Sequence, residues 1–209
     1  ADIDAGHYYT LSGVVPNAGD IKFVPQRDIE YKQEITDEDR TILGKDVPDF
    51  TYGVNLSLQY KGFEFSMFGQ GISGTKVAFD VYGVHPFYHG QDSPRKYHLK
   101  RWTEENPNSR FPRLTFMNKS HYLQTSDLWL MNGSYLRLKT AEISYTLPQK
   151  DFLKKVGIES VRFYCNGYNL LTLFSDLNDI DIDPEGVTDG GNNNYPNIRI
   201  YNFGVNISF

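Results

Sequence analysis

The sequence of 209 residues is poor in several features that common fold classes need. It has one cysteine, Cys165, so an internal disulfide is excluded, and we expect this residue to be a small apolar side chain on a strand. No apolar run approaches the roughly 20 residues of a membrane-spanning helix, and the mean hydropathy is -0.50. The net charge of -5 argues against a nucleic-acid partner.

Signals for export and for catalysis are also scarce. The first four residues lack the basic start and apolar core of a signal peptide, so we expect that a signal was removed or that the chain begins partway through a longer one. There is no Gly-x-Ser-x-Gly and no phosphate-binding loop. Adjacent Glu104 and Glu105 suit a turn better than a glycosidase pair, whose carboxyls lie about 5 to 9 Å apart. We therefore do not expect an enzyme.

Aromatic residues are abundant, at 15%, and they follow a two-residue period at the C-terminal end. This alternation predicts a strand with one apolar and one polar face. A last strand ending on an aromatic residue is typical of bacterial outer-membrane β-barrels, in which Phe209 would be read as an assembly signal. We predict that the apolar positions face lipid, namely Tyr201, Phe203, Val205 and Ile207, and that Asn202 and Asn206 line the lumen.

The same period recurs upstream. We predict that Tyr52, Val54, Leu56, Leu58 and Tyr60 face lipid and that Asn55, Ser57 and Gln59 line the lumen. Eight residues of a tilted strand climb roughly 20 Å, close to the ~25 Å apolar band of such barrels. The dipeptide Lys61-Gly62 that follows predicts a tight hairpin.

Five strands are predicted, over about residues 50–60, 63–73, 134–147, 159–174 and 198–209. In the third strand, the apolar residues change from even to odd positions, and a bulge near Lys139-Thr140 would keep them all on one face. Five strands cannot close a barrel, because the smallest single-chain ones have about eight. The predicted fold is therefore all-β, an antiparallel up-and-down transmembrane segment with the five C-terminal strands of a larger barrel.

The connections alternate between short and long. Short turns face the periplasm in such barrels and long loops face outward. We accordingly place Lys61-Gly62 and residues 148–158 in the periplasm, and residues 74–130 and 175–196 outside. Residues 1–49 are predicted to be an extracellular loop region leading into the barrel, and residues 50–209 to be the barrel strands with their loops.

An ordered series of short motifs carries a family resemblance. The motifs lie at residues 19–23, 37–41, 48–53, 129–139, 145–148, 169–172, 195–196 and 199–206. The series resembles the C-terminal end of SusC-like TonB-dependent transporters of Bacteroidetes outer membranes. The resemblance implies a 22-stranded barrel with a plug upstream, a SusD-like lipoprotein lid, energy from TonB, and import of oligosaccharides or peptides. The family's calcium-like acidic loop is absent, since residues 25–34 lack the alternating aspartates.

The long loops contain the candidate contact residues. Exposed aromatic side chains bind sugar faces and peptide side chains well, so we predict contacts to substrate or lid, with loop packing as the alternative, for Tyr82, Tyr88, Tyr97, Trp102 and Trp129. The spacing of His85, His89 and His98 does not suit a metal site. Carboxylates at Asp179, Asp181 and Asp183 could hold Ca²⁺, but no glycine sits between them, so we favour a solvated loop and expect no cofactor.

Two other functions remain open from the sequence. A secreted or surface-exposed sugar-binding β-sandwich would use the same alternation to build a core between two sheets. A cell-surface hydrolase is the third interpretation. Detergent dependence of extraction separates the barrel from the sandwich, and a turnover assay on glycans or peptides separates the hydrolase from both.

Overall fold

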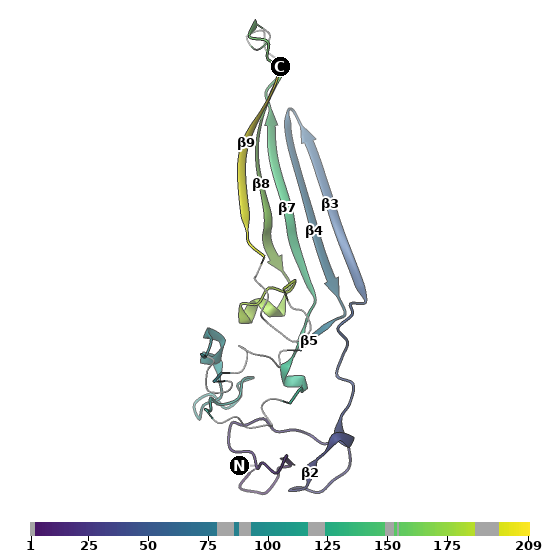
Figure 1. Ribbon diagram of the computed structural model, residues 1–209, viewed down its shortest axis with the longest axis vertical. Coiled ribbons are helices and arrows are strands. Elements are labelled where there is room, and N and C mark those ends of the chain that lie inside the picture. The colour runs from purple at the N-terminus through teal and green to yellow at the C-terminus, as the bar shows by residue number, and fades with distance from the viewer. Residues whose placement is uncertain are drawn as a thin grey trace.

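The computed structural model describes residues 3–78, 86–87, 93–116, 124–148, 153, 155–186 and 197–209. Its main element is one antiparallel sheet of five strands in the order β3-β4-β7-β8-β9 (Figure 1). The strands are β3 (Phe50–Tyr60), β4 (Phe63–Ser73), β7 (Tyr135–Thr146), β8 (Ser160–Leu173) and β9 (Ile200–Ser208). The predicted all-β class and the five strands are confirmed.

The turn between β3 and β4 is the two-residue hairpin that the sequence predicts. Tyr60 pairs with Phe63, and Lys61 and Gly62 have φ values of 46° and 85°. Positive φ at both central residues is the type I′ geometry that matches the twist of paired strands. A Cβ on Gly62 would lie 2.7 Å from the carbonyl oxygen of Thr146, so only glycine fits there.

The expected irregularity of β7 lies at Lys139. Phe68 pairs with Thr140 while Gly69 pairs with Leu138, so Lys139 is an extra residue relative to β4. A bulge of one residue moves the following side chains to the opposite face. Leu136 and Leu138 therefore share a face with Ile143 and Tyr145, as the sequence predicts.

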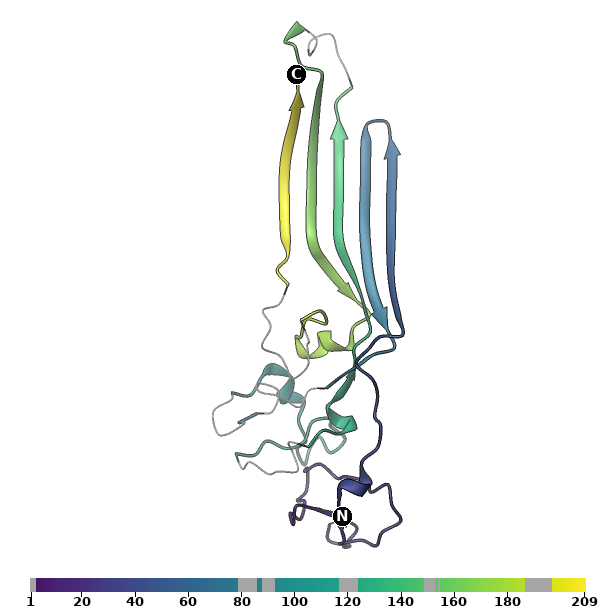
Figure 2. The same ribbon diagram turned by 45° about the vertical axis from the view of Figure 1, so that its right-hand side comes forward.

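The register places most of the large apolar side chains of the five strands on one face. Cross-strand rows run through directly paired residues: Tyr60, Phe63, Tyr145, Phe163 and Val205 form one row, and Leu58, Phe65, Ile143, Cys165 and Phe203 form the next. Within the described part of the chain, no second layer covers this face (Figure 2). Half or more of the surface of Leu58, Phe63 and Phe203 is exposed. This single layer differs from a sandwich, whose apolar faces pack on each other.

A smaller folded body lies at the end of the sheet opposite the β3–β4 hairpin (Figures 1 and 2). It contains β1 (Thr10–Leu11) with β2 (Glu34–Ile35), β5 (Lys76–Ala78) with β6 (Leu130–Asn132), and the 3₁₀ turns η1 (Asp37–Asp39), η3 (Lys96–Lys100), η5 (Asp127–Trp129) and η6 (Asp176–Ile180). We call it the loop body. Its core consists of Tyr97, Trp129, Met131, Leu177, Ile180 and Ile182.

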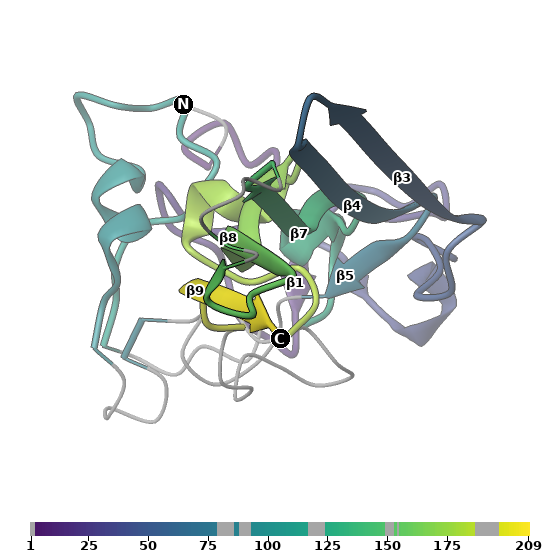
Figure 3. The same cartoon turned by 90° about the horizontal axis from the view of Figure 1, so that it is seen from above.

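The loop body combines residues that precede the first strand of the sheet with residues that connect later strands. Residues 3–49 precede β3 and lie at this end, together with the described parts of the loops after β4 and β8 (Figure 1). Seen from above, the five strands stand in one row, with β3 and β9 at the two edges (Figure 3). Over the described residues, no helix is long and apolar enough to cross a membrane.

Candidate functional site

The polar face of the sheet carries the side chains that were predicted to line a lumen. Ser57 pairs with Ser66, which pairs with Glu142, and this row continues through Asn166 to Asn202. Asn55, Gln59 and Asn206 lie on the same face. The predicted lipid-facing residues, from Tyr52 to Tyr60 and from Tyr201 to Ile207, all lie on the opposite face and are all exposed. Contact with lipid itself stays a prediction.

A cluster of charged side chains joins the polar face to the loop after β8. Arg137 of β7, only 4% exposed, donates to Asp183 Oδ1 at 2.6 Å and to Glu185 Oε2 at 2.8 Å. Lys139 Nζ lies 2.8 Å from the same Glu185 oxygen, and the amide nitrogen of Asn197 donates to it as well. We call these five residues the loop anchor. They tie both ends of the loop before β9 to the sheet.

The loop anchor also fixes the charge of its aspartate. Burial opposes the ionisation of Asp183, but hydrogen bonds from Arg137 and from the backbone N–H groups of Glu185 and Asn197 outweigh it and lower the pKa of Asp183. Arg137 further donates from Nε to Thr172 Oγ1 of β8 at 3.0 Å. One guanidinium thus connects two strands and one loop.

The aspartates that were weighed as calcium ligands have other surroundings. Asp183 pairs with Arg137, and Asp181 ends η6 with a left-handed backbone, φ 56°. Asp179 and Asp181 are exposed. Among the described residues, no three His, Cys, Asp or Glu side chains lie close enough together to hold a metal ion.

The structure separates the candidate aromatic residues into three groups. Tyr97 and Trp129 are 5% and 3% exposed in the core of the loop body, so packing, the alternative interpretation, describes them. Burial raises the pKa of Tyr97 to about 12. Trp102 is half-buried at a groove. Tyr82 and Tyr88 lie outside the described residues.

The groove beside Trp102 has a volume of about 480 Å³ and lies between two distant segments, residues 19–22 and 107–112. The N–H of Trp102 donates to the carbonyl of Phe111 at 2.8 Å, and a Cβ at Gly19 would overlap the indole ring. Gly19 has φ +79°. Arg113 holds the segment 19–22 in place through Asp20, at 2.6 Å. The groove offers a ring, two prolines and charges of both signs.

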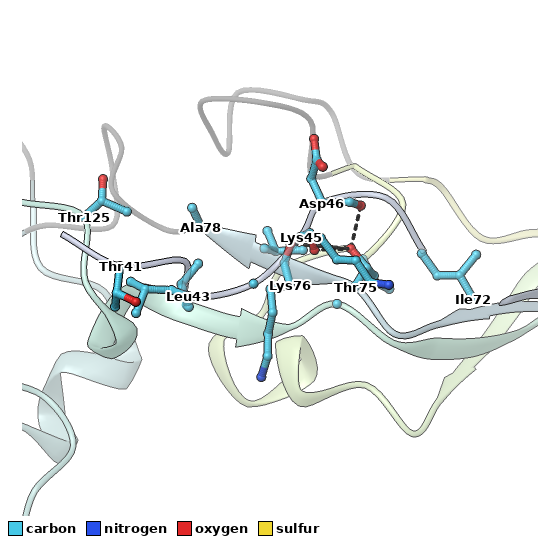
Figure 4. A pocket seen from close by; sticks show the side chains of 14 residues that line it. Thr41, Leu43, Lys45, Asp46, Ile72, Thr75, Lys76, Ala78 and Thr125 are labelled. Atoms are coloured by element: carbon cyan, nitrogen blue, oxygen red, sulfur yellow. Dashed lines mark hydrogen bonds between the residues drawn. The ribbon is translucent and has the colours of Figure 1, made fainter. Parts of the chain in front are cut away.

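A second groove, of about 490 Å³, lies between β5, β6 and the segment 41–46 (Figure 4). The segment is held by backbone pairing, since the N–H of Lys76 donates to the carbonyl of Lys45 at 2.7 Å. The hydroxyl of Thr75 donates to the carbonyl of Asp46 at 2.6 Å. The side chains of Asp46 and Lys76 point to opposite sides of this groove (Figure 4).

Residues 26–39, at the far end of the loop body, are organised around one aspartate. Asp39 accepts from the backbone N–H groups of Gln26, Arg27 and Thr36 and from the Arg27 guanidinium at 2.7 Å. The Arg27 guanidinium, with the N–H of Thr36, holds the pKa of Asp39 well below its usual range. Arg27 also reaches Glu38 and the Thr36 hydroxyl. An arginine thus occupies the centre of this acidic turn.

The structure also describes some of the other residues that the sequence analysis weighed. His98 is buried, and its Nδ1 accepts the backbone N–H of Arg95 at 2.8 Å. His85 and His89 lie outside the described residues. Glu104 and Glu105 occupy an exposed turn closed by the N–H of Asn106 on Thr103. Residues 69–74 match Gly-x-Gly-x-x-Gly, but they lie in and just after β4 with no helix following, so they do not form a dinucleotide site.

Comparisons with known proteins agree with this arrangement. No protein-family model matches the chain. Two curated relatives from Formosa agariphila do: TonB-dependent receptor P3, 32% identical over 96% of this chain and 20% of the relative, and TonB-dependent receptor P26, 33% identical over 84% and 18%. This chain therefore spans about a fifth of their length.

Solved structures show the same likeness in three dimensions. The RagAB peptide importer in its open-open state matches with a TM-score of 0.66 and 28% identity over 90% of this chain and 20% of the importer chain. Its closed-closed state matches with a TM-score of 0.67, over 90% and 21%.

The chain is a SusC-like segment of a TonB-dependent receptor. This SusC-like segment is a bacterial outer-membrane component, and its open sheet is part of the barrel wall. Sequence reasoning missed the loop anchor and the Arg27–Asp39 contacts. The available signals were a cation within a strand, Arg137 of β7, and acids in the loop after the next strand, β8, but their 46-residue separation hid the pairing.

Proposed function

We propose that this segment forms part of the wall and outer mouth of an active importer that carries peptides or oligosaccharides across the outer membrane. TonB supplies the energy, and a SusD-like lipoprotein closes the mouth. The general function, import of nutrients across the outer membrane, is supported by the similarity of the segment to TonB-dependent receptors and to the RagAB peptide importer.

One observation carries the proposal. On one uncovered face, two neighbouring rows of apolar or aromatic side chains and Cys165 cross all five strands, while the opposite face carries most of the polar side chains of the sheet. In water, a large exposed apolar surface is unfavourable, whereas lipid tails solvate it and a polar face then lines an aqueous interior. A single sheet with these two faces suits a barrel wall. It does not suit a carbohydrate-binding sandwich, because the other two described sheets, β1-β2 and β5-β6, have two strands each and lie in the loop body, not against the apolar face (Figure 2).

The two faces can be tested with neighbouring positions of one strand. In the full-length protein, Leu56→Arg would place a charge toward lipid, which costs about 2–4 kcal/mol near the bilayer midplane. Ser57→Arg is the matched control, because the same charge would face water. We expect Leu56→Arg to lower the amount of assembled, heat-modifiable barrel and Ser57→Arg to leave it unchanged. Equal tolerance of both would contradict the lipid-facing assignment.

The loop body supports substrate capture at the mouth. The groove beside Trp102 combines an aromatic ring, prolines and both charge signs, a surface that suits an extended peptide or a sugar ring. The likeness to a peptide importer favours peptides. We propose that Trp102 contacts the substrate and that the exposed surface of the loop body contacts the lipoprotein.

Uptake in cells tests the function directly. A strain lacking the full-length gene, complemented with wild type, would receive either a fluorescent tryptic peptide mixture or a labelled oligosaccharide mixture. We expect TonB-dependent uptake of one mixture, and a several-fold loss with Trp102→Ala. The control, Leu99→Ala, changes an exposed apolar residue that is three positions before Trp102 and does not line the groove. No TonB-dependent uptake of either mixture would refute the proposal, and an unchanged Trp102→Ala would refute the contact role of that residue.

A further inference from the structure

The residues around Trp102 carry a charge opposite to that of the rest of the chain. Residues 93–113 contain six Lys and Arg but only two Asp and Glu, which leaves +4, whereas the whole chain has a net charge of -5. Arg113 is neutralised within the fold by Asp20, whose side chain is fully buried. Five cations remain, and we call them the basic patch: Arg95, Lys96, Lys100, Arg101 and Arg110.

Two short segments bring the basic patch together. Four of its cations lie in or beside η3, whose 3₁₀ geometry rises about 2 Å per residue, so Arg95 and Arg101 are about 12 Å apart along it. The backbone of Arg101 pairs in parallel with that of Phe111, the residue after Arg110. Arg110 and Trp102 both line the groove described above. The basic patch is therefore continuous with this groove.

The basic patch is attached to the polar side of the sheet. Tyr97, which lies between the cations of η3, packs in the core of the loop body with Leu177 and Ile180 of η6. The loop that follows η6 is in turn tied to the polar face through Asp183 and Arg137. If the polar face lines the interior of a barrel, the basic patch lies beside its outer mouth.

The cations of the basic patch are available to a partner. Four of the five residues are exposed, and Arg101 is half-buried. In the part of the chain that the structure describes, no ion pair involves any of them. The nearby acids are Glu104 and Glu105, in their exposed turn, and Asp127, on the wall of the groove. Because these acids are fewer than the cations, the surface stays positive.

We propose that the basic patch selects acidic peptides at the mouth of the importer. Its cations pair with Asp and Glu side chains of the peptide, while the groove beside Trp102 holds a neighbouring apolar residue. The inference rests on the proposed function and deepens it, since it states which peptides this segment captures.

The geometry of the basic patch suits an extended acidic peptide. An extended chain advances about 3.3 Å per residue, so the length of η3 faces about four residues of such a peptide. Three of the five cations are arginines, whose planar fork matches a carboxylate. The excess positive charge also attracts anions before contact and disfavours basic peptides.

The groove favours a peptide over an acidic oligosaccharide. A Cβ at Gly19 would overlap the indole ring of Trp102, so Gly19 already covers part of one face of this ring. Less of the ring is then left for a sugar to stack on, whereas an apolar side chain can pack against its edge. The likeness to a peptide importer favours the same class of substrate.

Peptide binding by the purified full-length protein in detergent tests the inference. Two fluorescent peptides of equal length, one with four glutamates and the other with glutamines in their place, differ only in charge. We expect the acidic peptide to bind about tenfold more tightly at low ionic strength. This preference should disappear in about 1 M salt, where the Debye length is about 3 Å.

Charge reversal locates the preference. The double variant Lys96→Glu with Lys100→Glu changes two exposed side chains without removing an ion pair, and it should abolish the preference for the acidic peptide. Arg110→Gln should lower it by about two- to fivefold. The conservative pair Lys96→Arg with Lys100→Arg should keep it. Lys155→Glu, which reverses an exposed charge between β7 and β8, is the matched control and should keep it as well.

Four results would overturn the inference: equal affinity for the two peptides; a preference that the double variant retains; tighter binding of an oligogalacturonate of equal charge, which assigns the basic patch to acidic sugars; or loss of a copurifying lipoprotein from the double variant, which assigns it to the lid. TonB-dependent uptake of the same peptides by cells separates the two proposals. Uptake without a preference in binding refutes the selectivity alone. A preference in binding without uptake of either peptide refutes the proposed transport and leaves the selectivity in place.

Discussion

Replacing Arg137 by methionine should release the loop that follows β8. Methionine is similar in length but has neither the charge nor the donors, so Asp183 and Glu185 lose their shared partner. Their side chains are 10% and 14% exposed, so water cannot fully compensate for the loss. We expect the loop to open locally while the five strands stay paired.

The free-energy cost of Arg137→Met depends on the hydrogen-bond partners that each carboxylate retains. Removing one partner of a buried ion pair typically costs about 3–5 kcal/mol. Glu185 keeps Lys139 at 2.8 Å, and Asp183 keeps the backbone N–H of Asn197 at 2.9 Å. The expected cost is therefore near the low end, about 3 kcal/mol, or roughly a hundredfold in the opening equilibrium of the loop.

Hydrogen exchange of the full-length protein in detergent measures this equilibrium. Amides of residues 176–186 should exchange roughly a hundredfold faster in Arg137→Met, while those of the β3–β4 hairpin should not change. Arg137→Lys should fall between, because an ammonium keeps the charge but cannot reach both carboxylates and Thr172 with one planar group. An acceleration of less than about threefold in Arg137→Met would refute the reasoning, since the loop would then be held by its apolar core alone.

Three further predictions concern the ends of the chain and the sheet. Arg27 lowers the pKa of Asp39, so the stabilisation of the folded segment by ionised Asp39 is complete above the ordinary pKa of 3.8 and is lost as the pH falls through the lower pKa of the folded state. Without Arg27 this loss begins at a higher pH, so residues 26–39 of Arg27→Ala should become sensitive to proteolysis at a higher pH than those of the wild type. Identical pH profiles of the two proteins would contradict this. Gly71→Ala should lower the assembled fraction, because a Cβ there overlaps the Tyr52 ring and the carbonyl oxygen of Tyr135, at a cost of about 1–3 kcal/mol, whereas Gly69→Ala meets only ordinary contacts; equal heat-modifiable bands for both variants would disprove it. Deleting Phe209 should reduce barrel assembly and Phe209→Tyr should not, and unchanged amounts after deletion would remove the assembly role.

The sheet could be predicted from the sequence because its determinants are local. A two-residue period needs only neighbouring residues to be read, and the type I′ hairpin is set by Lys61-Gly62 alone. Even the bulge was visible, since the parity of apolar residues changes on either side of Lys139. Edges of the elements agree to within two residues for the same reason.

The loop body could not be predicted because its contacts are not local. Trp129 and Tyr97 are aromatic residues in long polar loops, where a surface role and a packing role have the same sequence signature. Only the contact with Leu177, which follows Trp129 by 48 residues and Tyr97 by 80, decides that they form a core. Likewise, the sequence shows Asp183 only as one of several acids in a loop, and the structure is needed to show that Arg137 pairs with it. The residue types of Tyr97, Trp129 and Asp183 thus suggest contacts with a ligand, whereas their positions in the structure show packing and ion pairing within the chain.

Alternation alone does not distinguish a barrel wall from half of a sandwich, because both need one apolar face. What differs is which face the rest of the chain covers. Here the chain covers the polar face, through the loop anchor at one end, and leaves the apolar face bare. A water-soluble fold does the reverse, since burying apolar surface is its main source of stability. The direction in which the loop folds is therefore an independent sign that the polar side is the interior, and it predicts that partners of this wall bind to its polar face.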